Sequence, residues 1–236
     1  MAVAEMVKWP GDQAGRRAVL ERAAALIGSG EVVAFPTDTV YGIGCRAWDE
    51  EVVARLYAIK ERPAQKAIAL LLYGAEQLGE VTDYRSKALA ELARRFWPGG
   101  LTLVVPWKPS RPAMGGEPFT TVGVRVPNHP IPLALIRRVG APLATTSANL
   151  SGSPSATTAA EVARQIGDRV ALIVDGGRCP GGQDSTVLDL TTDPPTIRRL
   201  GPVTNEELAS VVGRLQIEVQ GTKSAAEVSR QERGVG

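Results

Sequence analysis

Hydroxyl and amide side chains gather in one short run, Thr145 to Gly152, which reads Thr-Thr-Ser-Ala-Asn-Leu-Ser-Gly. The run follows the apolar stretch 141–144, so it lies where a buried strand is expected to emerge at its carboxyl end. Open α/β sheets bind ligands at such ends. The same residue types also favour turns. The run by itself therefore fits either a polar turn or a site that binds an anion.

Fixed cations and further hydroxyls follow other predicted elements. The loop after the second predicted helix carries Lys60, Arg62 and Lys66, and Pro63 restricts its backbone. Arginine presents a planar fork of donors that matches phosphate or carboxylate, and lysine adds a compact charge. A solvated loop is the alternative interpretation of these cations. The other runs of this kind are 37–39, 120–121, 185–186 and 198–199.

Arg125 lies within the predicted strand 122–126, in which Val122, Val124 and Val126 form one buried face. A charge on the other face of a central strand is costly unless it is paired. Arg125 therefore either lies on a solvated face or in a buried ion pair, or it lines a cleft and binds an anionic ligand.

Several mechanisms are excluded by residue counts and motifs. The only histidine, His129, lies between Asn128 and Pro130, which favours a turn residue over a catalyst. Two cysteines, without a CxxC pair, rule out a disulfide framework and favour a reducing, cytoplasmic location. The stretch 42–47 matches a loose dinucleotide pattern but follows polar residues instead of a buried strand, so we reject it. A net charge of +2 is low for a nucleic-acid binder, and no apolar run is long enough to cross a membrane.

The elements that must position these residues alternate along the chain. Periodicity predicts helices over 14–27, 50–60, 87–96, 131–139, 158–166 and 204–215, and strands over 32–35, 68–72, 101–105, 122–126, 143–145, 170–174, 186–190 and 196–199. Asp12 and Asp49 are predicted N-caps, and Thr158 and Thr204 begin capping boxes. The pattern indicates a single α/β domain, 1–215, with a mixed sheet flanked by helices. Residues 216–236 form a polar tail that we expect to be mobile.

Four motifs occur together and in order: Pro36-Thr-Asp-Thr-Val-Tyr-Gly42, Lys60-x-Arg62-(x)3-Lys66, Ser147-Ala-Asn149-x-Ser151-Gly152-x-Pro154 and Ser185-Thr186-Val187. In this combination the chain resembles the YrdC-type L-threonylcarbamoyladenylate synthases over about residues 15–215. The resemblance implies a twisted mixed α/β sheet with a large cationic cavity. One departure is Ala67, where the family commonly has proline after the lysine, and this affects the expected shape of the loop.

The resemblance implies a nucleotidyltransferase that joins L-threonine, bicarbonate or carbon dioxide, and ATP into threonylcarbamoyl-AMP and releases pyrophosphate. This would be the first step of threonylcarbamoyladenosine modification of tRNA. A partner transferase complex would then use the product, and weak direct binding of tRNA is left open. Magnesium would arrive with ATP and not on a protein cage. No protein nucleophile is required, because threonine's own amine attacks carbon dioxide and a carbamate oxygen then attacks the α-phosphate.

Carried over position by position, the resemblance assigns two sets of contacts. Residues expected to contact L-threonine are Thr39, Arg125, Thr145 and Ser185. Residues expected to contact ATP are Arg62, Lys66, Thr121, Ser147, Asn149, Ser155 and Arg199.

Two alternatives are carried alongside this interpretation. The first is a non-catalytic RNA-binding module of the same fold, which the low net charge argues against. The second is a related carbamoyladenylate-forming enzyme, similar to a domain of hydrogenase maturation proteins, whose zinc-finger cysteines this sequence lacks.

Overall fold

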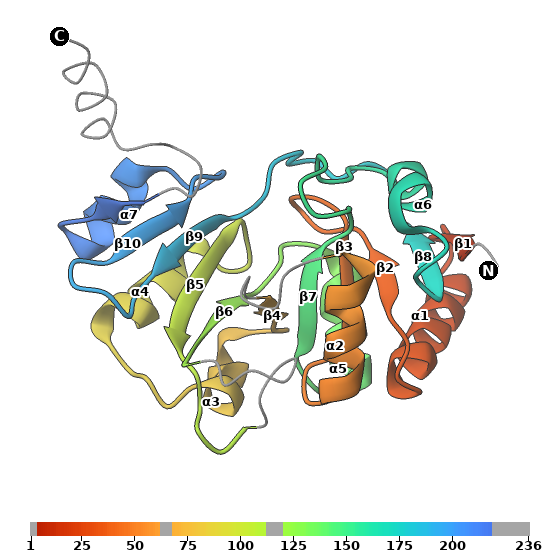
Figure 1. Ribbon diagram of the computed structural model, residues 1–236, viewed down its shortest axis with the longest axis horizontal. Helices are drawn as coiled ribbons and strands as arrows, with labels where there is room; N and C mark the ends of the chain where they lie inside the picture. Colours follow the sequence, from red (N-terminus) through yellow and green to blue (C-terminus); the bar gives the residue numbers. More distant parts are fainter. Residues whose placement is uncertain (1–3, 62–67, 112–119, 219–236) are drawn as a thin grey trace, which may run out of the picture.

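One mixed sheet organises the part of the chain that the structure describes, residues 4–61, 68–111 and 120–218 of a computed structural model. Its eleven strands lie in the order β1-β8-β2-β3-β7-β4-β6-β5-β9-β10-β11 (Figure 1). The sheet contains parallel pairs such as β5 with β9 and antiparallel pairs such as β3 with β7. The mixed α/β sheet predicted from the sequence is confirmed.

The strands are β1 Glu5–Lys8, β2 Val33–Phe35, β3 Gly42–Arg46, β4 Ala69–Leu71, β5 Leu101–Pro106, β6 Thr121–Arg125, β7 Leu143–Ser147, β8 Leu172–Asp175, β9 Thr186–Asp189, β10 Thr196–Arg199 and β11 Gln216–Ile217. The helices are α1 Gln13–Gly28, α2 Glu50–Ile59, α3 Leu78–Val81, α4 Lys87–Phe96, α5 Pro130–Val139, α6 Ala159–Ile166 and α7 Asn205–Val212. A short 3-10 helix, η1, covers Ala75–Gln77.

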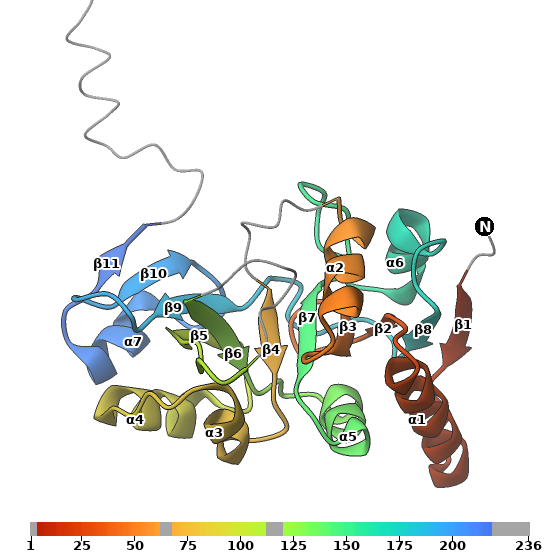
Figure 2. The same ribbon diagram turned by 60° about the horizontal axis from the view of Figure 1, so that its bottom comes forward.

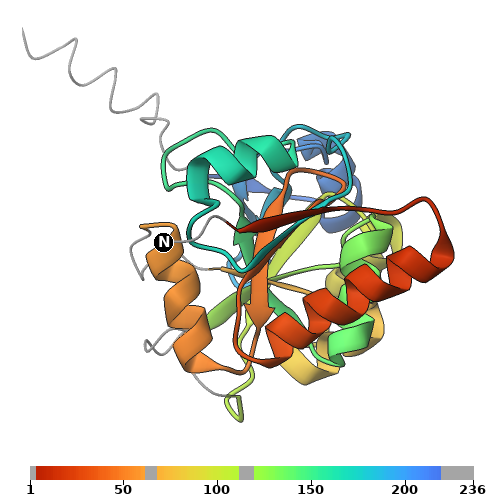
Figure 3. The same ribbon diagram turned by 90° about the vertical axis from the view of Figure 1, so that its right-hand side faces the viewer.

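Helices cover the sheet on both sides because successive strand residues point to opposite faces. In β2, Val33 and Phe35 pack in one apolar cluster with α1 and α5, whereas Ala34 packs in the other cluster with α2, α4, α6 and α7. Figure 3 shows α1 and α5 side by side, with α2 on the opposite side of the sheet. Figure 2 shows the strands from β11 to β1 across the view, with α3 and α4 near β5 and β6 and with α1 and α5 towards the other end of the sheet. The core is therefore divided by the sheet into two apolar layers.

Side-chain caps fix where the helices begin. The Asp12 and Asp49 carboxylates accept from backbone N–H groups of α1 and α2, and both predicted capping boxes form at Thr158 and Thr204. His129 is the N-cap of α5, where its Nδ1 accepts from the Ile131 N–H at 3.3 Å. Burial lowers the pKa of His129. The structural role predicted for this histidine is confirmed.

Local pattern missed or shortened four strands. β3 falls on the stretch 42–46 that was rejected as a dinucleotide loop, and it is a strand and not a phosphate loop. β7 continues through Thr146 and Ser147, although the sequence predicted that it would end at Thr145. β1 and β11 were not predicted, and each lies at an edge of the sheet. β11 pairs with β10, so the ordered sheet includes two residues of the expected tail, and 219–236 lie outside the described residues.

None of the helices in the described ranges has the length and apolar character needed to cross a membrane.

Gly201 follows β10 and packs closely against the backbone at the start of β9, and this packing can be tested. A Cβ atom at Gly201 would lie 2.4 Å from the Asp184 carbonyl oxygen and 2.4 Å from the Thr186 nitrogen. We expect Gly201→Ala to lower the free energy of unfolding by about 1–3 kcal/mol, because backbone must move to admit the methyl group. The matched control is Gly28→Ala, since Gly28 has nothing within 4 Å of its Cβ position. Urea titrations that show equal stability for the two variants would contradict this packing.

Candidate functional site at the polar face of the sheet

Small residues occupy neighbouring register positions across four central strands. Gly44 lies opposite Thr145, Thr145 opposite Ala69, and Ala69 opposite Gly123. A Cβ at Gly44 would lie 3.0 Å from ring carbons of Phe35 and 3.2 Å from Thr145 Oγ1. Gly44 thus leaves room for the Thr145 hydroxyl side chain close to the sheet, on the face that also carries Arg125.

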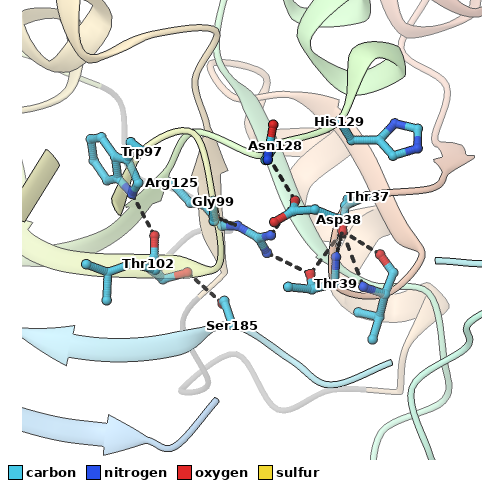
Figure 4. Close-up of polar contacts among 12 residues, drawn as sticks. Thr37, Asp38, Thr39, Trp97, Gly99, Thr102, Arg125, Asn128, His129 and Ser185 are labelled. Atoms are coloured by element: carbon cyan, nitrogen blue, oxygen red, sulfur yellow. Dashed lines mark hydrogen bonds and ion pairs between the residues drawn. The ribbon is translucent and has the colours of Figure 1, made fainter. Parts of the chain in front are cut away.

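Arg125 extends from the end of β6 and is almost fully enclosed, with 8% of its side chain exposed. Its Nη2 donates to Asp38 Oδ1 at 2.6 Å, its Nη1 to Thr39 Oγ1 at 2.9 Å, and its Nε to the Gly99 carbonyl at 2.9 Å (Figure 4). Desolvation lowers the pKa of Arg125, and the neighbouring Asp38 carboxylate opposes that effect. The buried ion pair considered from the sequence is therefore present. Two of the five guanidinium N–H groups are not used by these bonds.

The loop between β2 and β3 carries Asp38 and Thr39 to Arg125. Thr37 Oγ1 donates to the Val40 carbonyl at 2.7 Å and accepts from the Thr39 N–H at 3.1 Å, which closes a tight turn. The loop 176–182 packs against it, where the Gly181 N–H donates to the Asp38 carbonyl at 3.0 Å. A Cβ at Gly181 would lie 2.6 Å from that oxygen, so this close approach requires glycine. The turn is held by backbone contacts from a segment far along the chain.

Ser185 and Arg199 form a second polar group beside the first. The Ser185 hydroxyl lies 2.8 Å from Thr102 Oγ1 and accepts from Arg199 Nη2 at 3.0 Å. Asp184 pairs with Arg199 at 3.6 Å and accepts from Ser155 Oγ at 3.1 Å. Desolvation lowers the pKa of Arg199, and Asp184 opposes it. The charge of Arg199 also lowers the pKa of Arg125, so the two guanidinium groups act within one electrostatic environment.

Lys60 connects the end of α2 to the polar run after β7. Its Nζ donates to Ser147 Oγ at 3.1 Å, to Asn149 Oδ1 at 2.9 Å and to the Ser147 carbonyl. The Asn149 amide in turn donates to the Ser153 carbonyl at 2.6 Å. Lys60 is 1% exposed, so its charge is held by oxygen acceptors inside the protein. The ammonium group thereby fixes the conformation of the residues that follow β7.

The structure gathers most of the predicted site residues around these three groups. Thr39 lies in the group around Arg125. Ser155 lies in the group formed by Ser185 and Arg199. Ser147 and Asn149 lie in the group around Lys60. Thr145 donates to the Leu143 carbonyl at 3.1 Å, and Thr121 begins β6 on the same strand face as Arg125. Arg62 and Lys66 lie outside the described residues, as does the effect of Ala67 on their loop. Which ligand each residue contacts stays a prediction.

Sequence reasoning assigned no ligand contact to Lys60, Asp38, Thr102 or Asp184, each of which holds residues within one of these groups. Asp38 lies in the motif 36–42 and Lys60 in the motif 60–66. Each is a charged residue next to a predicted apolar element, and this position could have indicated an internal charge. Thr102 carried no signal, because a threonine in a strand is ordinary.

Other chemistry is restricted in this part of the molecule. Among the described residues, no three His, Cys, Asp or Glu side chains form a cluster suited to a metal ion. Burial raises the pKa of Cys179 to about 11 and that of Cys45 to about 12, so both stay thiols near neutral pH. Surface depressions of about 660 and 690 Å³ adjoin α4, and neither is lined by a predicted site residue. The large cationic cavity stays a prediction.

Lys60→Met tests the internal ammonium group. The substitution keeps much of the side chain's volume but leaves the Ser147 and Asn149 oxygens without their charged donor. We expect the free energy of unfolding to fall by about 1.5–3 kcal/mol, the usual range for a hydrogen bond to a charged group. Lys87→Met, at an exposed position of α4, is the control and should change stability little. Equal urea midpoints for the two variants would show that Lys60 does not stabilise the run after β7.

Comparisons with known proteins agree with this fold. The Sua5/YciO/YrdC family model, described as telomere recombination, matches residues 25–201. Threonylcarbamoyl-AMP synthase of Bacillus subtilis is 42% identical over 203 residues, which span 84% of this chain and 58% of the relative. The protein of the same name from Pyrococcus abyssi is 42% identical over 195 residues, 83% of this chain and 57% of the relative.

A solved structure, P. abyssi Sua5 complexed with L-threonine, is similar with a TM-score of 0.83 and 39% identity, covering 92% of this chain and 63% of that one. The chain therefore spans less than two thirds of the length of these relatives. The match of the family model to most of the chain, together with these identities, shows that the chain belongs to the Sua5/YciO/YrdC family.

Proposed function

We propose that this chain catalyses the ATP-dependent synthesis of L-threonylcarbamoyladenylate from L-threonine and bicarbonate or carbon dioxide, with release of pyrophosphate. The observation that carries the proposal is a pair of arginines on one face of the sheet, the buried Arg125 and the partly exposed Arg199, each held beside a hydroxyl group. Relatives named threonylcarbamoyl-AMP synthase support the choice of reaction.

In this reaction the protein acts by binding and orientation. Arg125 would hold the threonine carboxylate through its unused N–H groups, with Thr39, Thr145 and Ser185 contributing hydroxyls. The ATP phosphates would contact Arg62, Lys66, Ser147 and Asn149. Orienting two reactants can lower a barrier by up to roughly 7–11 kcal/mol, which suits a site without a protein nucleophile.

The remaining nucleotide contacts would come from Thr121, Ser155 and Arg199. Arg199 has 45% of its side chain exposed, so its guanidinium group is accessible to an incoming nucleotide. Its ion pair with Asp184 would have to be shared with the incoming nucleotide. Mg²⁺ would accompany the triphosphate, since magnesium usually keeps several waters and takes few ligands from protein.

The product would pass to a threonylcarbamoyl transferase complex that modifies tRNA, and we place this step in the cytoplasm. The product's mixed anhydride between a carbamate and AMP is an activated acyl donor, which is the chemistry that such a transferase requires. Weak direct binding of tRNA is part of the same proposal.

Pyrophosphate release from ATP tests the reaction. We expect release to require both L-threonine and bicarbonate. Release that is unaffected by threonine would contradict the proposal, and turnover with carbamoyl phosphate in place of threonine would favour the related carbamoyladenylate chemistry. RNA binding that weakens steeply with salt, without any release of pyrophosphate, would favour a binding module.

Arg125→Lys tests the role of the guanidinium fork. The lysine keeps the charge but loses the bidentate geometry, so we expect KM for threonine to rise about tenfold or more, a change of about 1.4 kcal/mol. KM for ATP should change less than threefold. Arg94→Lys, at an exposed position of α4, is the matched control. An unchanged KM for threonine in a folded Arg125→Lys protein would remove Arg125 from the carboxylate site.

A further inference from the structure

Asp38 is poorly explained as a counter-ion alone. Its Oδ1 already accepts two hydrogen bonds, from Arg125 Nη2 at 2.6 Å and from the Asn128 N–H at 3.0 Å. Within the described part of the chain, nothing donates to Oδ2, and this atom is not among the buried atoms that lack a partner. The Asp38 side chain is 15% exposed, so Oδ2 is the accessible part of an otherwise enclosed carboxylate.

The neighbourhood of Oδ2 favours a cationic ligand. The remaining N–H groups of Arg125 favour an anionic ligand group. The Asp38 carboxylate beside it favours a cationic one. Among the described residues, two guanidinium N–H groups and one carboxylate oxygen of this pair are not used in hydrogen bonds, and they carry opposite charges. An α-amino acid has the complementary arrangement, because its carboxylate and ammonium groups are attached to the same carbon atom.

We propose that Asp38 Oδ2 accepts a hydrogen bond from the α-amino group of the bound amino acid, and that Asp38 thereby selects amino acids over acids that lack an amine. The inference rests on the proposed function, because it assumes that Arg125 holds the substrate carboxylate. It adds a contact that places the reacting nitrogen. The ammonium, the neutral amine and the carbamate nitrogen each carry at least one N–H, so the same contact survives formation of the carbamate.

The position of Asp38 is fixed well enough to select a ligand. Thr37 closes the turn that contains Asp38, and the Asn128 N–H fixes Asp38 Oδ1 (Figure 4). The Gly181 N–H donates to the Asp38 backbone carbonyl. A carboxylate held in this way does not need to reorganise when the ligand binds, which favours discrimination between ligands.

Asp38→Asn tests the inference. Asparagine keeps the size of the side chain and an oxygen that can accept from Arg125 and Asn128, but it removes the negative charge. Two ligands are measured with the full chain by titration calorimetry and saturation-transfer NMR: L-threonine, and (R)-3-hydroxybutyrate, which keeps the carboxylate and hydroxyl and lacks the amine. We expect Asp38→Asn to weaken threonine binding at least tenfold and to leave 3-hydroxybutyrate binding within threefold of the unmodified protein.

The two ligands separate contact with the amine from positioning of Arg125. If Asp38 only positions Arg125, both ligands lose the same factor, and the inference is overturned. A loss of threonine affinity below threefold overturns it as well. If the unmodified protein binds ATP but not threonine, the proposed function fails first. A cooperative thermal transition and unchanged ATP affinity would show that Asp38→Asn is folded, even though loss of the ion pair with Arg125 lowers its melting temperature.

Discussion

The enclosed charge of Arg125 is the constraint on which the surrounding structure depends. A guanidinium removed from water is stable only if its N–H groups find acceptors and its charge finds a partner. Asp38, Thr39 and the Gly99 carbonyl supply these, from two loops on either side of β6. Those loops must therefore reach the end of β6 whenever the protein is folded. The close contact of Gly181 with the Asp38 carbonyl helps to hold one of these loops in place.

The polar network is built from segments that lie far apart in the sequence. Asp38 meets Arg125 across 87 positions, Thr102 meets Ser185 across 83, and Lys60 meets Ser147 across 87. In each pair, a charged or hydroxyl group inside the protein is satisfied by a group from another strand or loop. Since a half-satisfied internal network is costly, these contacts also hold the strands of the site in register.

Charge balance distinguishes this site from a simple cationic groove. Arg125 and Arg199 each lie beside a carboxylate, so two cations of the described site are paired with negative groups, whereas Lys60 is held by uncharged oxygens. Such an arrangement suits ligands that carry both signs better than it suits a uniform polyanion. The additional cations Arg62 and Lys66 belong to the loop for which a phosphate role was predicted.

The sequence by itself determined the alternation of helices and strands, the helix caps and the mixed α/β class, because apolar periodicity and capping are local properties. It also identified Arg125 as anomalous, since a charge among alternating valines is visible in a window of five residues. Only the tertiary structure decided that Asp38 is its partner, that Lys60 lies between Ser147 and Asn149, and that β3 is a strand. Hydrogen-bond partners separated by more than eighty residues are set by strand order and loop packing, and neither is encoded in a local pattern.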